Sequence, residues 1–249
     1  MLRYKIKSTI KSIIKRKKIT DDFDWELYHE HYEGEVAESG KKHTRILSPG
    51  DYLFKENELT INNEILPLHP NCHLLYETIL QLSPESVMEI GCGGGDNLRN
   101  INVLAPHIVL YGRDISTEQI NFLKKRHPRL DAAISQLDVT LPHPLNSPKV
   151  DIVFTQAVLM HIKTGNGHLV ALANLFHYAS KQIILMENWN NHNFKADIEL
   201  LFSKQMLPWK DVYMYYSDSS EYQKPHIMIL SSTPLVTYKR LSDYSCFLR

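Results

Sequence analysis

A run of glycines directly after a short apolar segment constrains this chain more than any other feature. Residues 87–90 are an apolar run that contains one acid, Glu89, and residues 91–95 are four glycines and one cysteine. Residues 96–101 then have the composition of the first turns of a helix. Glycine adopts positive φ and lets a ligand approach the backbone without a Cβ in the way. The sequence therefore predicts a strand-to-helix turn, and in an open α/β sheet ligands bind at such turns.

The spacing of the glycines distinguishes two kinds of nucleotide-binding turn. A dinucleotide-binding turn has the pattern Gly-x-Gly-x-x-Gly, whereas here Gly91 and Gly93 are followed by Asp96 at the third position. With Glu89 just before the turn, the segment instead resembles motif I of the class I S-adenosylmethionine-dependent methyltransferases. The alternative is an ordinary tight turn, because glycine-rich turns also occur where no ligand binds.

A second strand is predicted at residues 108–112, and Asp114 follows it 23 residues after Gly91. A carboxylate about 20 residues after the first glycine, at the end of the second strand, accepts hydrogen bonds from the ribose hydroxyls in sites of this type. We therefore expect Asp114 to bind a ribose, although an ordinary acid near the start of a helix would look the same. Residues 116–119 fit a capping box, which predicts that a helix begins there.

Two later segments agree with the resemblance. A weak strand at 130–135 precedes Asp138 and Val139, which in the family contact the adenine; a solvated loop aspartate would have the same pattern. Residues 150–155 are a clear buried strand and continue into residues 156–162, which resemble the fourth motif of the family and include His161. The resemblance implies S-adenosylmethionine as the cofactor. The residues expected to bind it are Glu89, Gly91, Gly93, Asp114, Ile115, Asp138, Val139 and Gln156.

The remaining elements predict the fold class. Apolar residues recur at helical spacing over 169–179, residues 181–187 form a fifth strand, and residues 211–217 and 226–232 form a closing antiparallel pair. Strands that alternate with helices favour an α/β fold. We expect a Rossmann-like class I methyltransferase sheet, mostly parallel with an antiparallel C-terminal strand, and helices on both faces.

The distribution of charge divides the chain. The 28 basic and 28 acidic side chains balance, yet residues 1–20 carry eight Lys or Arg and no acid. The apolar residues of this segment share one helical face, which predicts an amphipathic helix on an anionic membrane surface. A solvated arm, or a helix packed on another subunit, would show the same pattern. No stretch is long and apolar enough for a signal peptide or a membrane span, and the acidic remainder argues against nucleic acid as a partner.

Three segments are therefore expected: a basic amphipathic helix at 1–20, a cap at 21–68 and an S-adenosylmethionine-binding domain at 69–249. An aromatic face formed by Trp25, Tyr28 and Tyr32 within the cap could cover a ligand or dock the segment on the core. The three cysteines are few and scattered, which favours reduced thiols and a cytoplasmic location. The basic helix would place the protein at the inner face of the membrane.

Methyl transfer to a hydroxyl requires a base for the hydroxyl proton, and a histidine with a pKa near neutrality can accept it. His161 follows the fourth strand and is our candidate, although its ring could instead cap a helix or be buried with a partner. Glu187, Asn188 and Trp189 follow the fifth strand and are expected to line the acceptor side, where amide and indole groups suit a sugar. A metal held by His161 and Glu187 would need a ligand cluster that the sequence does not show, so no metal is expected.

The segment from Thr155 to Ile162, followed by a strand that ends in Glu187, more loosely resembles bacterial methyltransferases of surface-glycan synthesis. The resemblance implies an O-methyltransferase that acts on a sugar hydroxyl in capsule or O-antigen (lipopolysaccharide) synthesis, with a small molecule or a glycan as substrate. Two alternatives stay open: a methyltransferase of a non-sugar metabolite, and a noncatalytic module that binds the cofactor or serves as a scaffold. Neither the acceptor atom nor the oligomeric state follows from the sequence.

Overall fold

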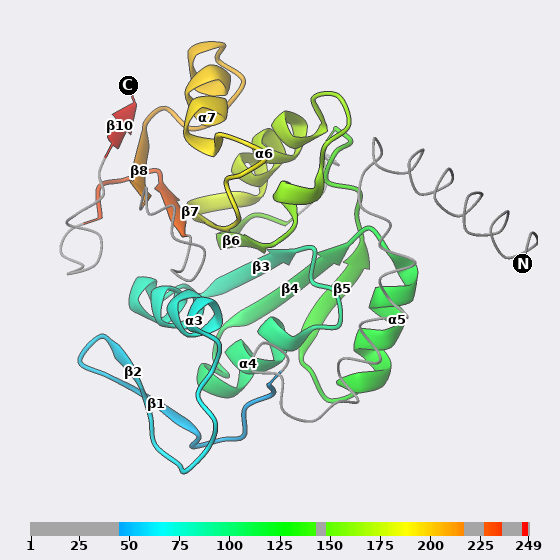
Figure 1. Ribbon diagram of the computed structural model, residues 1–249, viewed down its shortest axis with the longest axis vertical. Helices are drawn as coiled ribbons and strands as arrows, with labels where there is room; N and C mark the ends of the chain where they lie inside the picture. Colours follow the sequence, from blue (N-terminus) through cyan, green and yellow to red (C-terminus); the bar gives the residue numbers. More distant parts are fainter. Residues whose placement is uncertain (1–44, 143–147, 217–226, 236–245, 249) are drawn as a thin grey trace, which may run out of the picture.

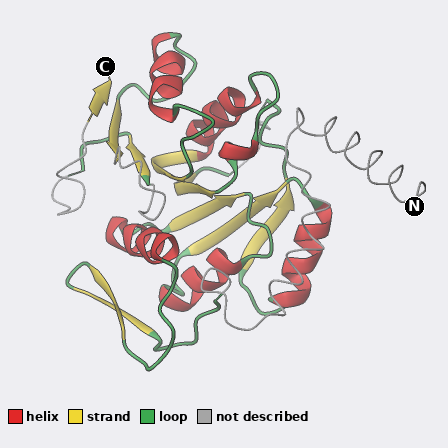
Figure 2. Cartoon of the chain, viewed as in Figure 1, coloured by secondary structure: helices red, strands yellow, loops and turns green. Residues whose placement is uncertain are grey.

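The computed structural model of the chain describes residues 45–142, 148–216, 227–235 and 246–248. Within these ranges eight strands form one sheet, and a separate hairpin lies beside it (Figures 1 and 2). The elements in chain order are β1 Tyr52–Lys55, β2 Glu58–Ile61, α3 Pro70–Leu82, β3 Ser86–Ile90, α4 Asp96–Leu104, β4 Val109–Asp114, α5 Thr117–Arg126, β5 Ala132–Gln136, β6 Val150–Gln156, η2 Leu159–His161, α6 Gly167–Tyr178, β7 Ala179–Met186, α7 Phe194–Ser203, β8 Val212–Tyr216, β9 Met228–Ser231 and β10 Cys246–Leu248.

The strand order of the sheet is β10-β8-β9-β7-β6-β3-β4-β5. The five strands from β5 to β7 are all parallel, and β9 pairs antiparallel with both β7 and β8. From β3 the chain moves outward to β4 and β5, and then returns to place β6 on the other side of β3. This reversal makes a topological switch point between β3 and β6, where open α/β sheets bind ligands.

Two hydrophobic cores hold helices on opposite faces of the sheet. Alternate residues of a strand point to opposite faces, and in β6 Ile152 and Phe154 join one core while Val153 joins the other. The first core includes the buried residues of α3 and α4, and the second includes those of α6 and α7. Figure 1 shows α3 and α4 below the sheet and α6 and α7 above it.

The predicted fold class is confirmed: the sheet is mostly parallel, the C-terminal strands β9 and β10 run antiparallel to the others, and helices cover both faces. The predicted pair at 211–217 and 226–232 is observed as β8 and β9. Of the two antiparallel strands, β9 lies between β7 and β8, and β10 lies at the edge of the sheet beside β8. The predicted fifth strand is β7, which ends at Met186, so Glu187 is the first residue of the following loop.

The predicted helix at 1–20 and the aromatic face at 25–32 lie outside the described residues. The described part of the predicted cap contains the β1–β2 hairpin, whose Tyr52 and Leu59 are buried in the same core as α3 and α4. Residues 45–68 therefore pack on the domain that follows them. Among the described helices, none has the length and apolar character needed to cross a membrane.

Candidate functional site

A cleft of about 590 Å³ lies at the switch point, at the carboxyl ends of β3, β4 and β6. In Figure 1 the arrowheads of β3, β4 and β5 point toward the same edge of the sheet. The cleft is lined by all eight residues expected to bind the cofactor and by His161, together with Cys72, Ile90, Cys92, Gly94, Asp96, Asn97, Gln119, Leu137, Thr140, Ala157, Val158 and Ile162. The structure thus brings together four segments that are far apart in the sequence.

The glycine turn closes tightly against the element that follows β6. Gly91 has φ of +76°, and a Cβ at this position would lie 2.3 Å from Cγ2 of Val158. The backbone N–H groups of Gly91 and Cys92 both donate to the carbonyl of Arg113 at the end of β4. The turn therefore requires glycine at position 91 for its conformation and for space.

Asp114 connects the glycine turn with the start of α5. Its two carboxylate oxygens accept hydrogen bonds from Gly93 N at 2.7 Å and from Ser116 N at 2.9 Å. Burial raises the pKa of Asp114, while these backbone N–H groups lower it. Each oxygen of a carboxylate has further acceptor capacity. A ribose that lies against the turn would find a fixed acceptor here.

Glu89 lines the cleft and is buried, and only one of its two carboxylate oxygens has a hydrogen-bond partner among the described residues. Asn97 Nδ2 donates to Glu89 Oε1 at 2.7 Å and to Gln156 Oε1 at 3.0 Å. Glu89 Oε2 has no hydrogen-bond partner among the described residues. Burial raises the pKa of Glu89 well above its usual value, Asn97 lowers it, and Asp114 and Asp96 raise it further. A cationic ligand group would offset this unfavourable burial.

The donor set fits S-adenosylmethionine. That molecule carries a sulfonium and an ammonium, and Glu89 together with Asp114 supplies negative charge and acceptors on the cleft wall. Asp138 and Val139 line the same cleft, and Asp138 Oδ1 accepts from Thr140 N and from Thr140 Oγ1. Exposed Ile115 offers an apolar surface beside them. Glu89, Asp114 and Asp138 are thus the groups that would hold the amino, ribose and adenine parts.

The fourth wall is the turn at residues 158–162, which contains η2. His161 lines the cleft from this turn and is half-buried. Burial lowers the pKa of His161, and the positive charge of Lys163 lowers it further. The neutral imidazole, which can accept a proton, is therefore favoured at neutral pH.

Glu187, Asn188 and Trp189 are not among the residues that line the cleft. Glu187 is 2% exposed and accepts hydrogen bonds from Val158 N and Met160 N at 3.0–3.1 Å. Its carboxylate therefore stabilises the 158–162 turn by accepting hydrogen bonds from the backbone of that turn. Trp189 stacks on Tyr216 with ring centroids 5.5 Å apart and meets Phe194 edge-on. Asn188 Oδ1 accepts from Asn190 N.

Asn97 is the main site residue that sequence reasoning missed. Tyr76 OH donates to its Oδ1 at 2.7 Å, and Asn100 Nδ2 donates to Tyr76 OH at 3.1 Å. These contacts orient the amide so that its Nδ2 faces Glu89 and Gln156. The sequence feature that could have identified Asn97 is its position in the first turn of the helix that follows the glycines. Cys92 also lines the cleft, but burial raises the pKa of its thiol well above the usual value, which disfavours a nucleophilic thiolate.

Comparison with known proteins agrees with this geometry. A family model described as a methyltransferase domain matches residues 88–192. No curated protein matches the chain significantly.

Solved structures share the fold. A TehB-like S-adenosylmethionine-dependent methyltransferase from Corynebacterium glutamicum is 12% identical, with a TM-score of 0.53 over 83% of this chain and 96% of that one. CalS10, an amino pentose methyltransferase from Micromonospora echinaspora, is 10% identical, with a TM-score of 0.53 over 66% of this chain and 91% of that one. Residues 88–192 therefore match a methyltransferase domain, and the described fold is shared with solved S-adenosylmethionine-dependent methyltransferases.

Proposed function

We propose that this S-adenosylmethionine-dependent methyltransferase transfers a methyl group to a hydroxyl of a sugar during the synthesis of a surface polysaccharide, a capsule or an O-antigen. The observation that carries the proposal is the position of His161. It is a half-buried imidazole on the wall of the cofactor cleft, and its surroundings keep it neutral near pH 7. A neutral imidazole is the general base that a hydroxyl acceptor needs.

The cofactor supplies an electrophilic methyl group on a sulfonium when bound. The protein must then align the acceptor oxygen and exclude water. Glu89 would hold the ammonium group, Asp114 would hold the ribose, and Asp138 would accept a hydrogen bond from the adenine amine. His161 would take the proton of the acceptor hydroxyl as the O–C bond forms and the bond between the methyl carbon and sulfur breaks, so that the thioether leaves.

The loop after β7 supports an acceptor site next to His161. Asn191 Nδ2 donates to the carbonyl of Met160 at 3.1 Å, and His192 Nε2 donates to the carbonyl of Ile162 at 2.8 Å. Residues 187–192 therefore lie directly against the turn that carries His161. Partly exposed Asn188 and Trp189 on this loop would meet the sugar with an amide and an aromatic edge. Glu187 would act through the turn and not by contact with substrate.

The acceptor class has support from two sources outside the cleft. An amino pentose methyltransferase has the same fold, so this fold accommodates a sugar acceptor. The eight basic residues at 1–20 would hold the enzyme at the anionic inner face of a membrane, where lipid-linked glycans are assembled. A cytoplasmic enzyme at this surface would meet such substrates.

The proposal is tested with the full chain, methyl-labelled S-adenosylmethionine and a panel of acceptors. Nucleotide-linked sugars and lipid-linked oligosaccharides are expected to take up label, and catechols and short peptides are not. Label only in non-sugar acceptors would refute the sugar assignment. Failure to bind S-adenosylmethionine in calorimetry would instead favour the noncatalytic scaffold.

The role of His161 has its own test. Replacing His161 by Ala should lower kcat by about 10²- to 10⁴-fold, the usual contribution of a general base, and leave the Kd for S-adenosylmethionine unchanged. His107→Ala, at an exposed histidine outside the cleft, is the matched control. Full turnover in the His161 variant would rule out its role as base.

A further inference from the structure

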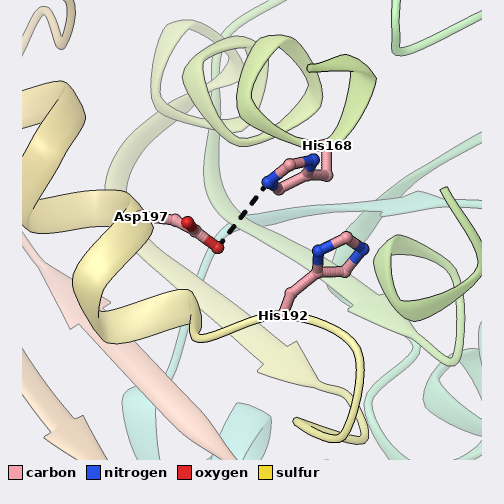
Figure 3. Close-up of side chains that lie close together, drawn as sticks. All are labelled: His168, His192 and Asp197. Carbon is pink, nitrogen blue, oxygen red and sulfur yellow. Dashed lines mark ion pairs between the residues drawn. The ribbon is translucent and has the colours of Figure 1, made fainter. Parts of the chain in front are cut away.

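A second cluster of chemically active side chains lies outside the cofactor cleft. His168 at the start of α6, His192 on the loop after β7 and Asp197 in the first turn of α7 each offer one ligand atom, and these atoms all lie within 4.8 Å of one another (Figure 3). All three side chains are partly buried. Figure 3 shows them meeting from three different elements.

The hydrogen bonds of the cluster leave ligand atoms available. His192 Nε2 donates to the carbonyl of Ile162 at 2.8 Å, which leaves the lone pair of Nδ1 for another partner. A histidine that binds a metal almost always donates its other ring N–H to a carbonyl or a carboxylate in this way. His192 is therefore already fixed in the tautomer that a metal ion requires.

The contacts between His168 and Asp197 do not satisfy either side chain. His168 Nε2 lies 3.8 Å from Asp197 Oδ2, which is too long for a hydrogen bond. His168 Nδ1 and Asp197 Oδ2 are buried and have no hydrogen-bond partner among the described residues. These two buried polar atoms are therefore left for a further partner.

We propose that His168, His192 and Asp197 bind a divalent transition-metal ion of the zinc class. Two imidazoles and one carboxylate are a common donor set for Zn²⁺, with a fourth position left for water. Bond lengths of roughly 2.1 Å place neighbouring ligand atoms about 3.0–3.4 Å apart. The pair His168 Nε2 and Asp197 Oδ2 therefore has to close by less than about 1 Å.

One ring must turn when the ion binds. The rings of His168 and His192 stack with centroids 4.1 Å apart and planes at 18°, so their in-plane lone pairs do not converge. His192 is held by the carbonyl of Ile162, whereas no hydrogen bond to Nδ1 holds the ring of His168. Rotation of His168 is thus the adjustment that brings the two nitrogens onto one ion.

The site would stabilise one wall of the cofactor cleft. Ile162 lines the cleft, and its carbonyl accepts the hydrogen bond from His192. A metal bound to His192 would therefore fasten the turn that carries His161 to α6 and α7. This inference does not depend on the identity of the methyl acceptor, and its test measures metal binding alone.

The test uses the full chain after a chelator has removed any bound metal. Zn²⁺ binding is measured by competition with a chromophoric chelator. Co²⁺ binding is measured in a second titration from the visible absorption of the bound ion. One equivalent of Zn²⁺ is expected per chain. His168→Gln and Asp197→Asn should each weaken Zn²⁺ binding more than about tenfold, since even outer partners of a metal contribute 10- to 100-fold. His177→Gln, a partly buried histidine at the other end of α6, is the matched control and should bind normally.

Circular dichroism of each variant checks its fold, and His192→Gln replaces a variant that does not fold. The proposal is overturned if the wild-type chain binds no Zn²⁺ and no Co²⁺. It is also overturned if the folded variants bind Zn²⁺ as tightly as the wild type does.

Discussion

Glu89 is the residue at which stability and binding oppose each other. It is 2% exposed, one of its oxygens has no hydrogen-bond partner among the described residues, and two other acids raise its pKa. Because its folded pKa lies above the ordinary value of 4.5, the folded protein holds a proton that the unfolded chain releases. The stability from Glu89 is therefore complete below about pH 4.5 and is lost as the pH rises through its folded pKa.

We expect Glu89→Gln to stabilise the cofactor-free protein at pH 8 by on the order of 1 kcal/mol, because it removes a buried charge. The gain should shrink toward pH 5. The same change should weaken S-adenosylmethionine binding by roughly 10- to 100-fold, since a hydrogen bond to a charged group contributes about 1.5–3 kcal/mol. Urea unfolding at the two pH values and calorimetry measure both effects. A variant that is less stable at pH 8, or that binds normally, would contradict this account.

Gly91 permits a second prediction because the chain contains a matched control. Gly91 and Gly165 both have positive φ, but a Cβ at Gly91 would overlap Val158, whereas a Cβ at Gly165 would meet no atom within 4 Å. Gly91→Ala should lower the free energy of unfolding by about 2 kcal/mol or more and reduce cofactor affinity, because Val158 lines the cleft.

Gly165→Ala should cost only its backbone strain, about 1 kcal/mol, and leave cofactor affinity unchanged. Chemical denaturation and calorimetry on both variants make the comparison. Equal losses of unfolding free energy and of cofactor affinity in the two variants would show that the contact with Val158 contributes to neither.

Among the elements, the turn at 158–162 is held by the loop after β7. Glu187, Asn191 and His192 all contact its backbone. The buried Glu187 carboxylate accepts from N–H groups at the start of η2, where partial positive charge collects. Burial raises its pKa, and the hydrogen bonds from Val158 N and Met160 N lower it. The position of His161 therefore depends on this loop.

Glu187→Gln should lower the free energy of unfolding by roughly 1.5–3 kcal/mol, because an amide has one acceptor oxygen for several donors. It should also reduce kcat more than it changes the Kd for S-adenosylmethionine. Glu199→Gln in α7 is the control: the two side chains of its pair with Lys195 are about one third exposed, and a change within about 0.5 kcal/mol is expected. Unchanged stability in Glu187→Gln would contradict the proposed role of its carboxylate.

For the whole molecule, the two cores leave the carboxyl edge of the parallel strands free to form the cleft. The hairpin residues Tyr52 and Leu59 join the core of α3 and α4, so the described part of the predicted cap packs against the domain that follows it. The basic segment at 1–20 lies outside the described residues, and its role stays a prediction from charge and periodicity.

We expect the full chain to sediment with vesicles that contain phosphatidylglycerol and not with phosphatidylcholine vesicles, and salt should weaken the binding. A chain without residues 1–20 should remain in the supernatant and still bind S-adenosylmethionine in calorimetry. Equal sedimentation of the full chain and the truncated chain would show that residues 1–20 do not bind the membrane.

The sequence by itself predicted the strands β3 to β7, the pair of β8 and β9, and eight cofactor-binding candidates that all line the cleft. Gly91, Gly93, Asp114, Asp138 and Gln156 lie at or just after the carboxyl ends of strands. Local backbone preferences determine such segments, and parallel strands then bring their carboxyl ends to one edge.

Only the tertiary structure decided which way the other polar side chains point. Glu187 follows its strand as expected but turns inward to the 158–162 turn, and Asn97 faces Glu89 because Tyr76 orients its amide. His168, His192 and Asp197 share no short motif and meet only because α6, the loop after β7 and α7 pack together. Short-range preferences fix the backbone of each segment, whereas the direction and burial of a side chain depend on what packs against it from elsewhere in the chain.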